Sequence, residues 1–216
     1  MSGARRALLA CGLLALAGAW LGPLPQWAPQ YFSAHMGMHV IVVAIAAPLL
    51  AGALGSARCD PVRRWPGLFH PLPTSVIELV VIWTWHAPAL HHLSRHHGWA
   101  LAIEQASFLT VSLMLWLSAF GGDTAPRLPR AAAGVAGLLM TSMHMTLLGV
   151  LLALAPRSLY GHGSAAMDDQ QWGGILMLAG GGISYLAGGL VLLSRMLDGV
   201  VPAPGGRRGT NPAEHR

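Results

Sequence analysis

Residues 33–54 read SAHMGMHVIVVAIAAPLLAGAL and contain no Asp, Glu, Lys or Arg. An α-helix needs about 20 apolar residues to cross the hydrocarbon core of a bilayer, so this stretch is long enough to span a membrane. Similar apolar runs lie on both sides of it, and the predicted spans are residues 7–21, 33–54, 72–93, 99–120, 131–155 and 170–196. The sequence therefore predicts an all-α, polytopic membrane bundle of about six transmembrane helices in one domain over residues 1–197.

The composition agrees with a membrane protein. The 216 residues are 54% hydrophobic and only 10% charged, they include no lysine, and the mean hydropathy is +0.53. Strands are not expected, because the apolar runs are long and do not alternate, and unpaired backbone groups are costly in lipid. The third span is the least hydrophobic, since it begins among prolines and contains Glu78.

Arginine is distributed unevenly between the two sides of the predicted bundle. Of 13 basic residues, only Arg95 and Arg157 fall on one side. The others share the opposite side: Arg5, Arg6, Arg58, Arg63, Arg64, Arg127, Arg130, Arg195, Arg207, Arg208 and Arg216. The positive-inside rule then places both termini in the cytoplasm and the histidine-rich segments outside, in a multi-pass protein of the cell inner (plasma) membrane. These arginines meet anionic lipid headgroups of the bilayer, and no nucleic-acid partner is expected.

The two ends of the chain carry separate predictions. Arg5 and Arg6 before a short apolar run also describe a secretory signal, so span one is either cleaved or, as we favour, retained as an anchor. Residues 198–216, rich in Pro, Gly and Arg, are predicted to be a disordered cytoplasmic tail. With Cys11 and Cys59 as its two cysteines, the chain has neither a disulfide framework nor a CxxC metal motif.

Histidines gather at the outer ends of the spans. His35 and His39 are four residues apart, so they project from one helical face and can share a metal ion. Such a pair serves equally for hydrogen bonds between packed helices, although polar groups inside a span favour function. His86, followed by Ala87-Pro88, lies at the same outer interface and can bring a third imidazole, while Met36 places a thioether beside His35.

Other polar residues lie near these histidines. His144, among the methionines of span five, is interpreted as an interhelical hydrogen bonder or, as the alternative, a ligand. Residues 87–98 are predicted to be an outer loop whose histidines are solvated, with weak metal gathering as the alternative. Glu78, about two turns below His86, is interpreted as a structural or proton-relay group. Glu104 lies early in span four, and Asp168 and Asp169 open span six, where acids favourably meet the helix dipole.

The ligand types indicate the class of metal. Imidazoles bordered by thioethers, without cysteine, favour copper. Imidazole binds zinc equally well, so zinc stays open. Haem is the other alternative, with two histidines from facing helices as axial ligands. His35 and His39 lie on one face and cannot clamp a haem from both sides, so His86 or His144 would have to contribute.

An ordered series of short motifs over residues 31–196 resembles the integral-membrane CtaG family of cytochrome c oxidase assembly factors. The motifs are His35-Met36-Gly37-Met38-His39, Ala47-Pro48-Leu49-Leu50, Trp85-His86-Ala87-Pro88, Glu104 with Ser107-Phe108 and Trp116, Leu159-Tyr160, and Asp169-Gln170-Gln171 with Gly173 and Met177. The family pattern has a histidine after the glutamate of span four, and this chain has Gln105 there. A ligand role at that position is therefore not carried over.

The resemblance implies a role in maturing haem-copper terminal oxidases through copper handling, without catalysis. The positions that match the family are His35, Met36, His39, His86, Glu104 and Asp169, and the first four are predicted to bind the metal. The expected partners are oxidase subunits and a periplasmic copper chaperone. Two alternatives stay open: a haem-binding electron carrier that uses His86, and a transporter in which Glu78, Glu104 and Asp169 mark an ion path.

Overall fold

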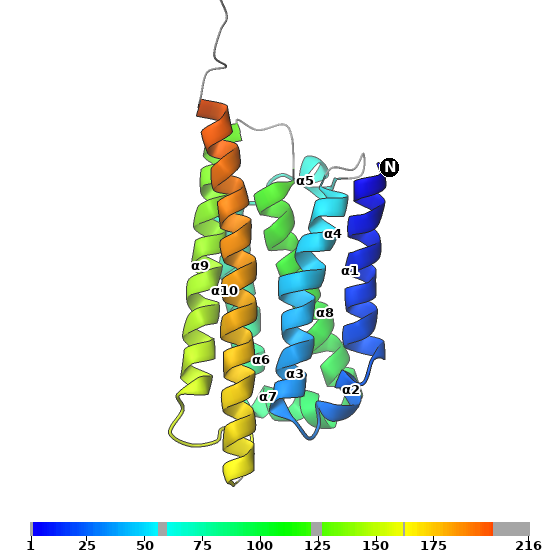
Figure 1. The fold of residues 1–216 in the computed structure, drawn as a ribbon, viewed down its shortest axis with the longest axis vertical. Helices are drawn as coiled ribbons and strands as arrows, with labels where there is room; N and C mark the ends of the chain where they lie inside the picture. The colour runs from blue at the N-terminus through cyan, green and yellow to red at the C-terminus, as the bar shows by residue number, and fades with distance from the viewer. Residues whose placement is uncertain (1, 56–59, 122–126, 162, 201–216) are drawn as a thin grey trace, which may run out of the picture.

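The computed structural model describes residues 2–55, 60–121, 127–161 and 163–200. Within them every regular element is a helix, and Figure 1 shows the long helices side by side in one bundle. The elements are α1 (Gly3–Leu21), α2 (Leu24–Trp27), α3 (Phe32–Val40), η1 (Ile41–Ala46), α4 (Ala47–Leu54), α5 (Pro61–Arg64), α6 (Pro71–His86), α7 (Pro88–His96), α8 (Gly98–Phe120), α9 (Arg127–Ala153) and α10 (Ser164–Val200). The all-α prediction is confirmed.

Several of these helices are long and apolar enough to cross a bilayer. In the described part of the chain there are 5 such segments: Gly3–Trp27, Phe32–Leu54, Gly98–Phe120, Pro129–Ala153 and Ser164–Ser194. They correspond to five predicted spans, and the last helix is longer than the predicted 170–196. The third predicted span contains α6, whose 16 residues extend about 24 Å at 1.5 Å per residue. The protein is a multi-pass membrane bundle.

The region around Pro88 departs from the predicted span and loop. The predicted span 72–93 ends as a helix at His86, and the predicted loop 87–98 folds as the separate helix α7. A proline disfavours the α conformation in the residue before it, and Ala87 has φ −61° and ψ 132°. Pro88 then occupies the first turn of α7, where its missing N–H costs nothing. The break turns the chain across the end of the bundle.

A second irregularity lies in the helix that carries His35 and His39. Between α3 and α4 the chain forms the π-helical segment η1, after which Pro48 supplies no N–H for hydrogen bonding. Backbone carbonyls in this region bond to side chains instead: the indole N–H of Trp116 donates to the Val43 carbonyl (3.3 Å) and the Ser184 hydroxyl to the Ala44 carbonyl (2.7 Å). Hydrogen bonds to backbone carbonyls of this span therefore connect it to α8 and α10.

Glycines let α10 approach its neighbours closely. A Cβ added at Gly174 would lie 2.6 Å from the Ala153 nitrogen and 2.8 Å from the Gly149 oxygen, both in the backbone of α9. A Cβ at Gly173 would lie 2.4 Å from the Phe32 ring, and one at Gly180 would lie 2.3 Å from Val40, both in α3. Small residues at such crossings bring helix backbones together in membranes. The glycine pairs of α10 thus fix α3 and α9 against it.

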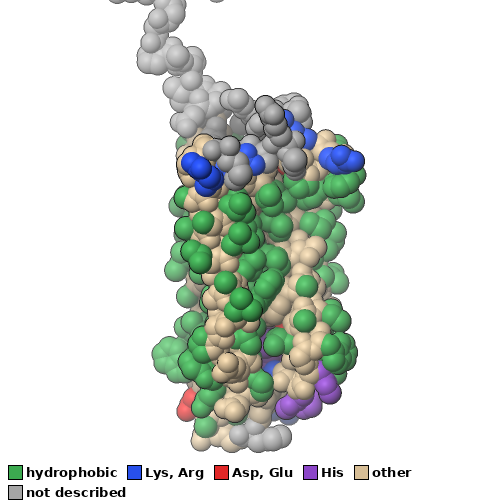
Figure 2. Space-filling model, turned by 90° about the vertical axis from the view of Figure 1, so that its right-hand side faces the viewer, with side chains coloured by type: hydrophobic (Ala, Val, Ile, Leu, Met, Phe, Trp, Pro, Cys, Tyr) green, Lys and Arg blue, Asp and Glu red, His purple; other side chains and the backbone are tan. Residues whose placement is uncertain are grey.

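The two ends of the bundle differ in charge. Figure 2 shows arginine side chains at the end where α1 begins and histidines at the opposite end. We call them the arginine end, which includes α5, and the histidine end, which includes α2, α7 and the link from α9 to α10. Cys11 is an exposed free thiol in α1. Cys59 and residues 201–216, most of the predicted tail, lie outside the described residues.

The close approach of α10 to α9 yields a stability prediction. Gly174→Ala should lower the free energy of unfolding by about 1–3 kcal/mol, because the new methyl meets backbone that cannot rotate away. Gly182→Ala is the matched control, since a Cβ there meets nothing within 4 Å and alanine favours helix by about 1 kcal/mol. Thermal unfolding in detergent, followed by circular dichroism, measures both. Equal midpoints for the two variants would contradict the packing described.

Candidate metal site at the histidine end

The start of α3 is held from outside by α10. The residue before the helix, Tyr31, provides no side-chain cap. Instead, the Asp169 carboxylate accepts the backbone N–H of Phe32 (2.5 Å), the backbone N–H of Ser33 (3.1 Å) and the Ser33 hydroxyl. Asp169 thus caps α3 and not its own helix, which begins at Ser164. Its role is to place the first turn of α3, and therefore His35, against the neighbouring helices.

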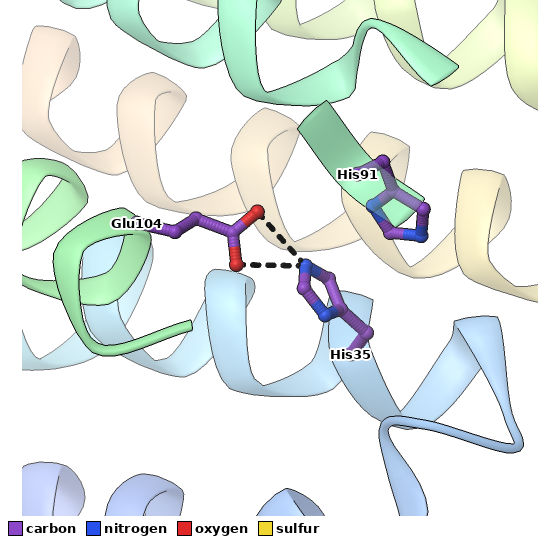
Figure 3. A group of neighbouring side chains, drawn as sticks. All are labelled: His35, His91 and Glu104. Atoms are coloured by element: carbon purple, nitrogen blue, oxygen red, sulfur yellow. Dashed lines mark hydrogen bonds and ion pairs between the residues drawn. The ribbon is translucent and has the colours of Figure 1, made fainter. Parts of the chain in front are cut away.

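His35 forms a buried pair with Glu104 of α8. The imidazole Nε2 lies 3.2 Å from one oxygen of the Glu104 carboxylate and 3.1 Å from the other, and both side chains are 1% exposed. The His91 ring of α7 lies at the third corner, with its centroid 4.6 Å from that of His35 (Figure 3). Ligand atoms of the three residues all lie within 4.8 Å of one another. Metal bonds of about 2 Å require donor atoms within about 4 Å of one another, so the three side chains would have to move closer to share one ion.

A second pair of imidazoles lies one turn deeper along α3. The centroid of the His39 ring lies 5.3 Å from that of His86, which ends α6, and the Phe108 ring of α8 packs against both. His86 Nδ1 lies 2.7 Å from the Ile82 carbonyl. Because a carbonyl only accepts, Nδ1 carries the proton and Nε2 carries the lone pair. A hydrogen bond from one ring nitrogen to a backbone carbonyl is the kind of contact that orients a histidine whose other nitrogen binds a metal.

The histidines at this end leave an unusual number of polar atoms without partners. Buried polar groups in proteins are normally hydrogen-bonded, and each exception calls for an explanation. In the described part of the chain, six ring nitrogens of the four histidines are buried without a hydrogen-bond partner: His35 Nδ1, His39 Nδ1 and Nε2, His86 Nε2, and His91 Nδ1 and Nε2. We call these four residues together with Glu104 the histidine cluster. Its donor atoms suit a metal ion that imidazole binds.

Aromatic residues and Arg95 hold the outer side of this cluster. The Tyr160 ring packs on His91 at 4.3 Å and on Phe32 at 4.6 Å, and its hydroxyl donates to the His86 carbonyl (2.7 Å). Arg95 donates to the carbonyls of Ala28, Tyr160 and Pro29, at 3.1, 3.0 and 2.8 Å. One guanidinium thus joins α7 to two loops. Burial lowers the pKa of Arg95 and raises that of Tyr160.

His91 is the residue of the cluster that sequence reasoning missed. The sequence predicts a solvated outer loop here, with weak metal gathering as the alternative, and the structure buries His91 to 1% exposure in α7. Burial first, and then the neighbouring imidazoles of His35 and His86, lower its pKa, so the ring is neutral and its lone pair is available for a metal. Pro88, a preferred first residue of helices, was the sequence signal for a helix here. On that helix His91 and Ser94 share the buried side.

Three other predicted residues lie apart from the cluster. Met36 is buried, and its Cγ packs at the position where Gly173 of α10 lacks a side chain. His144 is buried in α9, and neither of its ring nitrogens has a hydrogen-bond partner in the described structure, so the predicted interhelical bond is not seen. Glu78 lies eight residues before His86 in α6, about 12 Å along the helix.

Glu78 is bonded to hydroxyl groups from three other helices. Its carboxyl group accepts from Ser112 of α8 (2.5 Å), Thr141 of α9 (3.1 Å) and Tyr185 of α10 (3.2 Å). Four helices thus meet at one buried side chain. This arrangement fits the structural interpretation of Glu78, because every bond it makes links α6 to a packing partner.

Comparison with known proteins identifies the family. The family model described as cytochrome c oxidase caa3 assembly factor matches residues 1–198, nearly the whole chain. The chain belongs to this family. The resemblance found in the motifs from His35 to Met177 is thereby confirmed. Neither the curated proteins nor the solved structures that were compared include a match to the chain.

The cap on α3 yields a prediction about this caa3 assembly factor. Asp169→Asn should destabilise the protein by about 1 kcal/mol, because a neutral amide accepts the α3 N–H groups less strongly than a carboxylate. It should also loosen the position of His35. Asp168→Asn, at an exposed neighbour in the same helix, is the control. Thermal unfolding in detergent tests the prediction, and equal stability of the two variants would show that the cap contributes nothing.

Proposed function

We propose that this assembly factor handles copper for the oxidase, holding the ion at the histidine cluster of His35, His39, His86, His91 and Glu104 before it reaches the oxidase copper centre. The copper is cargo in this proposal and not a resident cofactor. The observation that carries it is the set of six buried ring nitrogens without partners. A buried polar group without a partner costs about 1–3 kcal/mol, and a metal ion removes that cost for several nitrogens at once.

The donor set supports copper as the cargo. Imidazole nitrogens bind copper, zinc, iron and nickel, so the donors define a class of metal ions. Membership in a cytochrome c oxidase assembly family narrows the class, because a haem-copper oxidase needs copper delivered during maturation. Met36, the remaining predicted ligand, is a neighbour of His35 in sequence whose side chain packs toward α10. We therefore assign it a packing role and replace it with His91 in the proposed ligand set.

Haem fits this cluster less well than a metal ion. A haem between two histidines needs a flat slot beside both imidazoles. Here the Phe108 ring centroid lies 4.4 Å from that of His39 and 6.3 Å from that of His86, so an aromatic side chain already packs beside both imidazoles.

Orientation and location are part of the proposal. The arginines of α1 and α5 at one end favour a cytoplasmic arginine end under the positive-inside rule, in the plasma membrane. The histidine cluster then opens toward the outside. From that side the factor would meet a copper donor and the oxidase subunit that takes up the metal.

Metal content of the purified protein tests the proposal. The wild type in detergent should hold close to one tightly bound copper per chain, and His35→Ala/His39→Ala/His86→Ala should hold essentially none. The single variant His91→Ala should lower copper affinity at least about 10-fold, because it removes a proposed ligand and loss of even an outer-shell partner has a cost of this size. His70→Ala, an exposed histidine, should bind as the wild type does. Elemental analysis and competition with a copper chelator give both quantities.

Measurements on the same samples can also contradict the proposal. Copper retained by the triple variant would place the metal elsewhere. A haem absorption band in the wild type that disappears in the triple variant would replace copper handling with haem binding. In cells, the triple variant should insert in the membrane and lower oxidase activity, and full activity would show that the histidine cluster is not needed for assembly.

A further inference from the structure

The exposed side of α7 carries a second pair of histidines that the buried cluster does not use. His92 and His96 are four residues apart, so they lie one above the other on the helix. Their ring centroids are 4.2 Å apart, and both side chains are exposed. Two neutral imidazoles at this spacing can bind one metal ion and leave its other coordination positions open.

This pair lines a cleft at the histidine end. The cleft has a volume of about 570 Å³, and its walls come from α7 and from the loops around Pro29 and Tyr160. Its lining includes His92, His96 and also His91, which is 1% exposed and belongs to the buried cluster. One residue is therefore shared by the cleft and the cluster.

The order of imidazoles forms a path from the cleft inward. His91 is among the residues that line the cleft, its ring centroid is 4.6 Å from that of His35, and His39 follows one turn deeper along α3. The separation of the His91 and His35 rings is short enough for an ion to be passed by exchanging one imidazole lone pair for another. The ion keeps its oxidation state in these steps, so no electron donor is needed.

Charges along this path favour inward movement. The Arg95 guanidinium lines the cleft and is bonded to three carbonyls, so its positive charge stays near the mouth. The carboxylate of Glu104 lies beyond His91, inside the cluster. A cation is therefore less favoured at the mouth than beside Glu104, where the low dielectric strengthens the attraction.

We propose that His92 and His96 form an outer docking site for copper ions, from which the metal passes through His91 to the histidine cluster. This inference rests on the proposed function, because the cluster is the receiving site. The docking site binds weakly and exchanges quickly, since it has two ligands and is open to solvent. The cleft and the cluster then act in sequence, one collecting the ion and the other retaining it.

Loading kinetics of the full-length protein in detergent test the docking site. The probe is Cu⁺ supplied under reducing conditions from a chromophoric chelator, with the absorbance of the chelator complex reporting transfer. His92→Ala/His96→Ala should keep the tightly bound copper at saturation, lose a second and weaker equivalent, and load at least about 10-fold more slowly, because the ion is no longer held at a high effective concentration beside His91. The control His97→Ala removes an exposed histidine of the same region that does not line the cleft.

The outcomes separate this inference from the proposed function. Loading of the double variant at the wild-type rate with all equivalents would overturn the docking site while leaving the cluster intact. A weak equivalent that depends on His92 and His96, without a tight one that depends on the cluster, would overturn the proposed function and the transfer step. Equal slowing by His97→Ala would show that the effect is a general one of surface histidines and would also overturn the docking site.

Discussion

Polar groups inside a membrane bundle must find partners within the protein, because hydrocarbon offers none, and the arrangement of this structure depends on that constraint. The carbonyl of Val43, within the π-helical segment, accepts the indole N–H of Trp116. The carboxyl group of Glu78 takes three hydroxyls from three helices. Against this background the unpartnered ring nitrogens of the histidine cluster are the main departure. Departures of this kind concentrate at functional sites, where the ligand supplies the missing partner.

One proline connects the fold to the site. Pro88 ends α6 directly after His86, so that this imidazole stands at the end of the helix and its carbonyl is free to accept the Tyr160 hydroxyl. The same break turns α7 across the end of the bundle. The His91 ring of α7 thereby packs against the His35 ring of α3. A straight helix through residue 93 would carry His91 away from α3. The local backbone rule before proline therefore determines which imidazoles meet.

The sequence predicted the parts of the site that depend on local pattern. The spacing of His35 and His39 places both on one face of a helix, and the proline after His86 marks a helix end at the same level. His91 could not be assigned in the same way, because its burial depends on how α7 lies against α3 and α8. The cap by Asp169 is likewise a contact over 137 residues. Five span helices followed from length and hydropathy, whereas contacts between helices required the three-dimensional arrangement.

Under the proposed function, a delivery site must hold its metal without trapping it, and the cluster combines features that would serve both needs. Leaving several imidazoles buried without partners destabilises the free protein, so an ion that pairs with them stabilises the fold through linkage, by about 2.7 kcal/mol at a concentration 100 times the dissociation constant. Burial in a low dielectric would strengthen the attraction between a bound ion and its ligands Glu104 and His35. His91, although buried, also lines the cleft that the exposed His92 and His96 line. In the proposed transfer, ligand exchange through His91 would let the ion move between the cluster and the outside without unfolding the bundle.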